Sequence, residues 1–241
     1  MNIWGKIIGS TTGFAIGGPI GALLGGAAGH AIDKIKTKKQ MPEELALKQI
    51  GFTIGIIVLS AKMAKADGKV TKKEILAFKE KINVPDNEIK NVAFLWDQAK
   101  KSSDGFEVYA IQVADLLKKK SPVLEELLNL LLDIAKADGE ITKPEITYLK
   151  KVSQIFGFSN DDFERIVSYK TEGLTDPYKV LGVSQDNSFN EIKTKWKNLV
   201  INHHPDLLIS QGMPEELVKK SLQRIKEVNN AWDIIKNKKM F

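Results

Sequence analysis

The chain has 241 residues, 43% of them hydrophobic, which is the length and composition of a folded protein with one large domain or two smaller ones. It has no cysteine, and this excludes disulfides, thiolate metal sites, cysteine nucleophiles and thioester-linked lipids. Only two of the basic residues are Arg, and the net charge of +6 is divided between the two ends of the chain. A nucleic-acid partner, which requires a concentrated basic surface, is therefore not expected.

Residues 7–29 carry no charge, and as a helix they are long enough to cross a hydrocarbon core of about 30 Å. Glycine recurs there at every fourth position, at Gly9, Gly13, Gly17, Gly21, Gly25 and Gly29. In lipid such a segment stays helical, and a stripe of small residues lets a second helix approach closely. We predict a membrane anchor over residues 1–33 that forms a homodimer. Pro19 leaves two forms open, a single span or a hairpin of two short helices.

A basic linker over residues 34–44 follows the anchor, whereas only Lys6 and the amino terminus precede it. The lysines that follow are Lys34, Lys36, Lys38 and Lys39. Positive charge stays on the cytoplasmic side of a membrane segment. We therefore predict a single-pass protein of the cell inner membrane, with its N-terminus outside and its bulk in the cytoplasm.

The middle of the chain contains an internal repeat, AKADGKVTKKEI at residues 64–75 and AKADGEITKPEI at residues 135–146. Apolar helical runs flank each copy, so we expect two similar helical hairpins packed together. Gly68 and Gly139 suit a left-handed helix end, and the next helix begins with a capping box, formed by Thr71 with Glu74 and by Thr142 with Glu145.

The acidic residues of the repeat also allow a second interpretation. Asp67, Glu74, Asp138 and Glu145 form an oxygen-rich site for a divalent cation if the two hairpins pack with pseudo-twofold symmetry. The spacing is too short for an EF-hand loop. Capping and cation binding both stay open at this point, and no other cofactor is expected.

The duplicated KADG-x-[VI]-T-x-x-E-[IL] element resembles the TerB family associated with tellurite resistance, over a predicted helical domain at residues 45–172. Members of that family are suspected of binding metal through such acidic residues. We expect further helices over residues 86–100, 106–119 and 160–169, with Phe94 and Trp96 in the core.

Residues 175–241 predict three helices. A short one opens at Asp176-Pro177, a second runs from the capping box of Ser188 and Glu191 to about residue 202, and a long one runs from Pro214 to about residue 237. The second and third helices are expected to pair antiparallel through apolar stripes. The stripes are Ile192, Trp196 and Leu199 on one helix, and Leu217, Leu222, Ile225, Val228, Ala231 and Trp232 on the other.

His204, Pro205 and Asp206 lie in the expected loop between these two helices. Together with the flanking DPYKVLGV, EIKTKWKNLVIN and NNAWDIIK stretches, this tripeptide resembles a J domain from end to end. The resemblance implies that the tripeptide binds a DnaK-type chaperone, and that Lys193 and Lys197, one helical turn apart, form a basic docking face. One departure is Leu207, at a position where J domains commonly have Lys.

The sequence thus predicts an all-α chain with a membrane segment, a duplicated TerB-like bundle and a J-domain hairpin. This order, and the WGKIIG…GHAIDK opening, resemble the DjlA-type membrane co-chaperones. That resemblance implies a co-chaperone, not an enzyme, which stimulates the ATPase of a cytoplasmic DnaK-type heat shock chaperone. The alternative is a cation- or stress-responsive module whose J domain only recruits the chaperone. A metal or hydrolytic site at His203, His204 and Asp206 lacks further ligands in the sequence.

Overall fold

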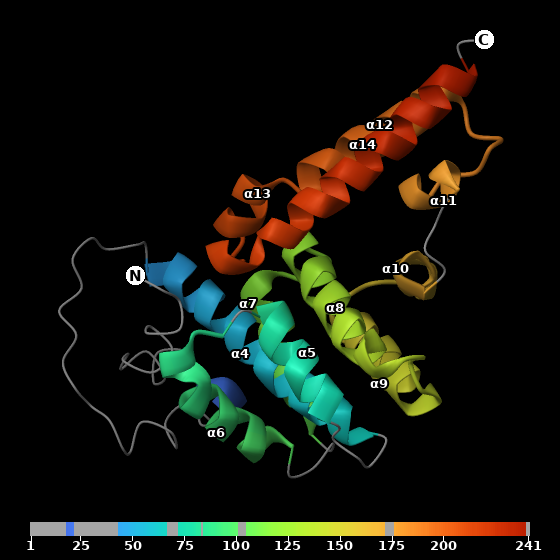
Figure 1. Cartoon of the computed structure of the whole chain (residues 1–241). Helices are drawn as coiled ribbons and strands as arrows, with labels where there is room; N and C mark the ends of the chain where they lie inside the picture. The colour runs from blue at the N-terminus through green and yellow to red at the C-terminus, as the bar shows by residue number, and fades with distance from the viewer. Residues whose placement is uncertain are drawn as a thin grey trace.

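A computed structural model describes residues 18–21, 43–66, 72–82, 84–100, 105–171 and 176–239, and all regular secondary structure in these ranges is helical (Figure 1). The all-α prediction is confirmed. The first helices form a bundle, and two long helices, α12 and α14, extend from it side by side (Figure 1). The bundle helices are α4 (Glu43–Ala66), α5 (Lys72–Ile82), α6 (Ile89–Ala99), α7 (Phe106–Leu117), α8 (Pro122–Ala135), α9 (Lys143–Ile155) and α10 (Asn160–Thr171).

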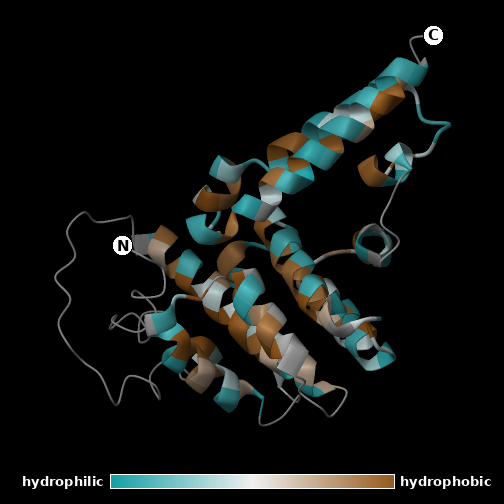
Figure 2. Ribbon diagram, in the orientation of Figure 1, coloured by the Kyte–Doolittle hydropathy of each residue, from teal (hydrophilic) through white to brown (hydrophobic). Residues whose placement is uncertain are grey.

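Helix α4 is the centre of the bundle. It packs against α6, α7, α8 and α9, and every residue from 49 to 64 is buried. By length and hydropathy, residues 44–66 form the one described helix that could cross a membrane, but 72% of its apolar window is buried inside the protein. In Figure 2 the hydrophobic stretches of the bundle gather where its helices meet. Helix α4 is therefore the core helix of this domain.

The close contact between α4 and α7 depends on two glycines, Gly51 and Gly55, which lie one turn apart on α4. A Cβ atom on Gly51 would overlap Leu116 Cδ2, and one on Gly55 would lie 2.8 Å from Val113 Cγ2, which is shorter than van der Waals contact. The two helices approach closely only because these positions have no side chain.

The helices that flank the two copies of the repeat pack together: α8 contacts α4, α5 and α9, and α9 also contacts α4. The second turn has the predicted capping box: Thr142 N–H donates to Glu145 Oε2 at 2.8 Å, and Glu145 N–H donates to Thr142 Oγ1 at 3.4 Å. The prediction for Gly139 was wrong in detail, because its φ of 142° and ψ of −123° lie outside the left-handed helical region. The first turn, residues 67–71, lies outside the described residues.

The C-terminal helices are α11 (Pro177–Leu181), α12 (Phe189–Asn202), α13 (Pro205–Ser210), the 3-10 turn η3 (Glu215–Leu217) and α14 (Lys219–Lys239). Of these, α11, α12 and α14 form a second core of their own. The rings of Trp196 and Trp232 stack 4.9 Å apart between α12 and α14, and Trp196 Nε1 donates to Asn229 Oδ1 at 2.9 Å. The buried members of this core are Val180, Leu181, Ile192, Leu199, Val228, Ala231, Trp232 and Ile235.

Two predictions about apolar faces were wrong. The long helix starts at Lys219 rather than at Pro214. Its buried positions Ser221, Arg224, Val228, Ala231 and Ile235 follow a spacing of three and four residues, and Leu222 lies beside this stripe, 46% exposed. Phe94 is 42% exposed because α6 packs against the bundle through its other face, which carries the buried Trp96.

Residues 18–21 form one helical turn that lies against α7. Ile20 is buried, and its N–H donates to Gln112 Oε1 at 2.9 Å. If residues 18–21 were inserted in a membrane, the hydrogen bond between Ile20 and Gln112 would be broken. Gly21 is the one described member of the predicted glycine stripe, and the others lie outside the described residues. Span and hairpin therefore both stay predictions.

Candidate functional site

The tripeptide lies at the tip of the α12–α14 hairpin, at the end opposite the capping box of Ser188 and Glu191 that begins α12. The loop predicted for it was wrong in part, because Pro205 and Asp206 begin the short helix α13. His204 is the residue before this helix, and its Nδ1 accepts a hydrogen bond from Asp206 N–H at 3.2 Å. Proline at the first helical position and this cap together hold the turn.

The functional side chains of the tripeptide face solvent. The His204 side chain is 54% exposed and that of Asp206 is 89% exposed, with 3.8 Å between His204 Nδ1 and Asp206 Oδ2. The imidazole can act as donor or acceptor, and the carboxylate can pair with a cationic group. The tip therefore exposes two polar groups to solvent, close to each other.

Lys193 and Lys197 are both exposed on α12, four residues apart, on the helix that leads to the tripeptide. Residues at this spacing lie on the same face of a helix. The structure thus leaves both predicted components of the docking surface, the basic face and the tripeptide, open to solvent.

The two adjacent histidines lie in different environments. His203 is 1% exposed, and its Nδ1 lies 2.6 Å from Glu126 Oε1 on α8, whereas His204 faces solvent. The three residues of the disfavoured metal or hydrolytic site, His203, His204 and Asp206, thus lie in different surroundings. No group of three potential metal-binding side chains was found within the described part of the chain.

Among the four predicted cation ligands, Glu145 is the one whose side chain the structure describes. It is 3% exposed, and Oε2 accepts from both the backbone N–H and the hydroxyl of Thr142, at 2.8 and 2.9 Å. These contacts are those of a helix cap. The side chains of Asp67, Glu74 and Asp138 lie outside the described residues, so a shared cation site stays a prediction.

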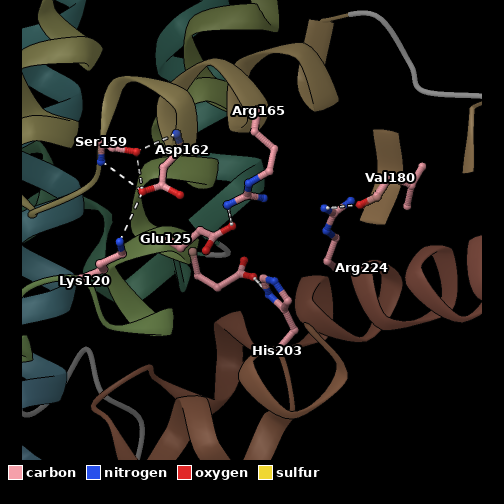
Figure 3. A network of polar contacts seen from close by, with 9 residues as sticks. Lys120, Glu125, Ser159, Asp162, Arg165, Val180, His203 and Arg224 are labelled. Atoms are coloured by element: carbon pink, nitrogen blue, oxygen red, sulfur yellow. Dashed lines mark hydrogen bonds and ion pairs between the residues drawn. The ribbon is translucent and has the colours of Figure 1, made fainter. Parts of the chain in front are cut away.

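A polar network joins the J-domain hairpin to the bundle (Figure 3). Glu125 accepts from Arg165 Nη2 at 3.0 Å beside the His203–Glu126 contact. Burial opposes ionisation of Glu125, but Arg165, His203 and Arg224 outweigh it and hold the pKa of Glu125 below its usual value. Burial lowers the pKa of Arg224 to about 10, and its Nη2 donates to Val180 O at 3.4 Å.

Sequence reasoning did not find this network. His203 was visible only as part of a histidine pair, and nothing near Glu125 or Glu126 in the sequence indicates a contact 77 residues away. Contacts between distant segments depend on how the domains pack, and local patterns carry no information about them.

Three family models match the chain in the predicted order. The Co-chaperone DjlA transmembrane domain matches residues 1–48, Tellurite resistance protein TerB matches 53–168, and the DnaJ domain matches 176–240. The first of these matches supports a membrane protein with its membrane segment at the N-terminal end. A comparison with solved structures found no match.

Curated relatives named Co-chaperone protein DjlA align over nearly the whole chain. The protein from Vibrio parahaemolyticus is 28% identical and covers 100% of both chains. That from Photobacterium profundum is 26% identical, over 99% of this chain and 100% of its own, and that from Coxiella burnetii is 25% identical, over 98% of each. With its three domains in this order and its full-length similarity to these relatives, the chain is a DnaJ-type co-chaperone of the DjlA type.

Proposed function

We propose that this co-chaperone stimulates ATP hydrolysis by a cytoplasmic DnaK-type chaperone through His204, Pro205 and Asp206. The observation that supports this most strongly is the exposure of the His204 and Asp206 side chains on a turn that Pro205 and the cap hold in shape. The direct test adds the full chain, in lipid vesicles, to a DnaK-type chaperone with ATP and measures phosphate release. An unchanged rate at every concentration of the chain would overturn the proposal.

Lys193 and Lys197 are proposed to attract an acidic surface of the chaperone. Charges at the rim of an interface mainly accelerate association and make it sensitive to salt. We expect the Lys193→Gln, Lys197→Gln variant to need about two to thirty times more chain for half-maximal ATPase stimulation at low salt, since each lysine contributes about 0.2–1 kcal/mol. At high salt the variant and the parent should need the same concentration of chain for half-maximal stimulation.

Lys236→Gln, Lys238→Gln is a matched control for this experiment, because both lysines are exposed and lie on α14, outside the predicted docking face of α12. The control should titrate like the parent at either salt concentration. Equal behaviour of the two double variants would show that α12 contributes no specific docking face.

For the membrane segment we propose a cytoplasmic location for the bulk of the chain and self-association through Gly9, Gly13, Gly17, Gly21, Gly25 and Gly29. The match to a transmembrane domain and the lysines after the segment support this orientation. Because the chain has no cysteine, one introduced at Asn2 can be labelled specifically. A membrane-impermeant reagent should label it from outside the inner membrane, and protection there would contradict the orientation.

The TerB match over both repeat copies supports a second candidate function, a cation-responsive module that uses the J domain to recruit the chaperone. It predicts that calorimetric titration of the full chain with divalent cations releases heat, and that the Asp67→Asn, Asp138→Asn variant loses this heat. Equal traces for the two proteins, or no heat from the parent, would overturn the cation-responsive function.

A further inference from the structure

The TerB-like bundle carries a docking surface for the J domain of the same chain. Leu208, Met213, Leu217 and Val218, all C-terminal to the tripeptide, belong to the buried core of the bundle and not to the core of the hairpin. Gly212 lies so close to α4 that a Cβ atom there would be 2.5 Å from Lys48 Cβ. The segment between α13 and α14 is thus packed into the bundle.

The polar part of this contact lies directly beside the tripeptide. His203 immediately precedes His204, and Glu126, its partner on α8, is only 5% exposed. Glu126 comes from the N-terminal part of α8, next to Glu125, which pairs with Arg165 on α10. A buried polar group that loses its hydrogen-bonding partner raises the free energy of the protein. Arrangements of the tip that separate His203 from Glu126 are therefore disfavoured.

A second contact restrains the other side of the J domain. Gly182, which ends α11, lies against Arg165, since a Cβ atom there would be 2.9 Å from Arg165 Cδ. Arg224 on α14 is buried and interacts electrostatically with Glu125 and Glu126. The J domain therefore contacts the bundle at three places, which are α11, the tripeptide end of the hairpin and the start of α14. Figure 3 shows the polar groups that lie between the two domains.

We propose that the His203–Glu126 contact holds the tripeptide in a fixed orientation on the TerB-like domain, and that His203 is a positioning residue for chaperone docking. This inference rests on the proposed stimulation of a DnaK-type chaperone. The contact does not cover the docking groups, because His204, Asp206, Lys193 and Lys197 all stay exposed. This geometry therefore supports an effect on the orientation of the tripeptide and not an inhibition of chaperone docking.

Fixing the tip before the partner arrives reduces the entropy lost on docking. Releasing it, by Glu126→Ala or His203→Ala, is expected to raise the concentration of chain needed for half-maximal ATPase stimulation about two- to tenfold. The maximal rate should stay unchanged, because the tripeptide itself is intact. Glu126→Gln keeps a hydrogen-bonding side chain of the same size and should restore the parent value.

The orientation can be measured without the chaperone. Nitroxide labels on Glu164→Cys in α10 and Lys236→Cys in α14, both exposed positions in a chain without cysteine, report the distance between the domains in the full chain. We expect one narrow distance distribution for the parent and for Glu126→Gln, and a broad one for Glu126→Ala and His203→Ala. Circular dichroism establishes that each variant is folded.

Asp133→Ala is the matched control, since it removes another carboxylate of α8 that pairs within the bundle, with Lys170 at 2.8 Å. It should leave both the distance distribution and the half-maximal concentration unchanged. A narrow distribution in Glu126→Ala, or a lower half-maximal concentration, would overturn the positioning role. If His204→Gln keeps full stimulation while the distances behave as expected, the proposed function fails and the interdomain contact stands.

Discussion

Replacing His204 with Gln is expected to reduce stimulation of the chaperone ATPase to the basal rate, with little effect on the fold. The ring is 54% exposed, and the hydrogen bond that it accepts comes from Asp206 N–H, within its own turn. Loss of a cap of this kind costs about 0.5–2 kcal/mol. Truncating one partner of a hydrogen-bonded contact in an interface costs about 2–5 kcal/mol, which corresponds to a loss in binding of about thirtyfold or more.

The measurement is phosphate release by a DnaK-type chaperone with increasing concentrations of the full-length chain in vesicles. Circular dichroism and membrane fractionation of the His204→Gln variant should match the parent. Lys236→Gln, a single exposed change on α14, serves as the control and should stimulate normally. Stimulation retained by His204→Gln would refute the assignment of the tripeptide.

Replacing Phe52 with Ala is expected to lower the free energy of unfolding by about 3–5 kcal/mol, the usual cost of removing a buried aromatic ring. Phe52 lies in the middle of α4 and has no exposed surface. This substitution tests whether α4 is the core helix of the bundle, as its contacts with α6, α7, α8 and α9 indicate, or an apolar helix that crosses a membrane. The ring of a lipid-facing residue would contribute little to the unfolding of the bundle.

Urea unfolding of the detergent-solubilised chain, followed through tryptophan fluorescence, measures this change, because Trp96 is part of the same core. Phe94→Ala makes the same substitution on α6 at a side chain that is 42% exposed, and should cost about 1 kcal/mol or less. Equal losses for the two variants would contradict a central position for α4.

Much of the local structure could be predicted because its causes lie within one helical turn. Thr142 with Glu145 and Ser188 with Glu191 form the predicted capping boxes, since each pair is three residues apart and needs no distant partner. Pro205 begins a short helix where the sequence predicts a loop, and its fixed φ suits the first helical position.

The sequence by itself determined the helical class, the order of the domains, the helix caps and the tripeptide, because periodicity, capping chemistry and short motifs act between neighbouring residues. Only the tertiary structure decided which apolar faces are covered, and thus that Phe94 and Leu222 are exposed and that α4 is buried. It also decided that His203 turns inward while His204 faces solvent. The physical reason is that burial and pairing depend on distant groups, here Glu126, which lies 77 residues from His203 in the chain and 2.6 Å from its ring.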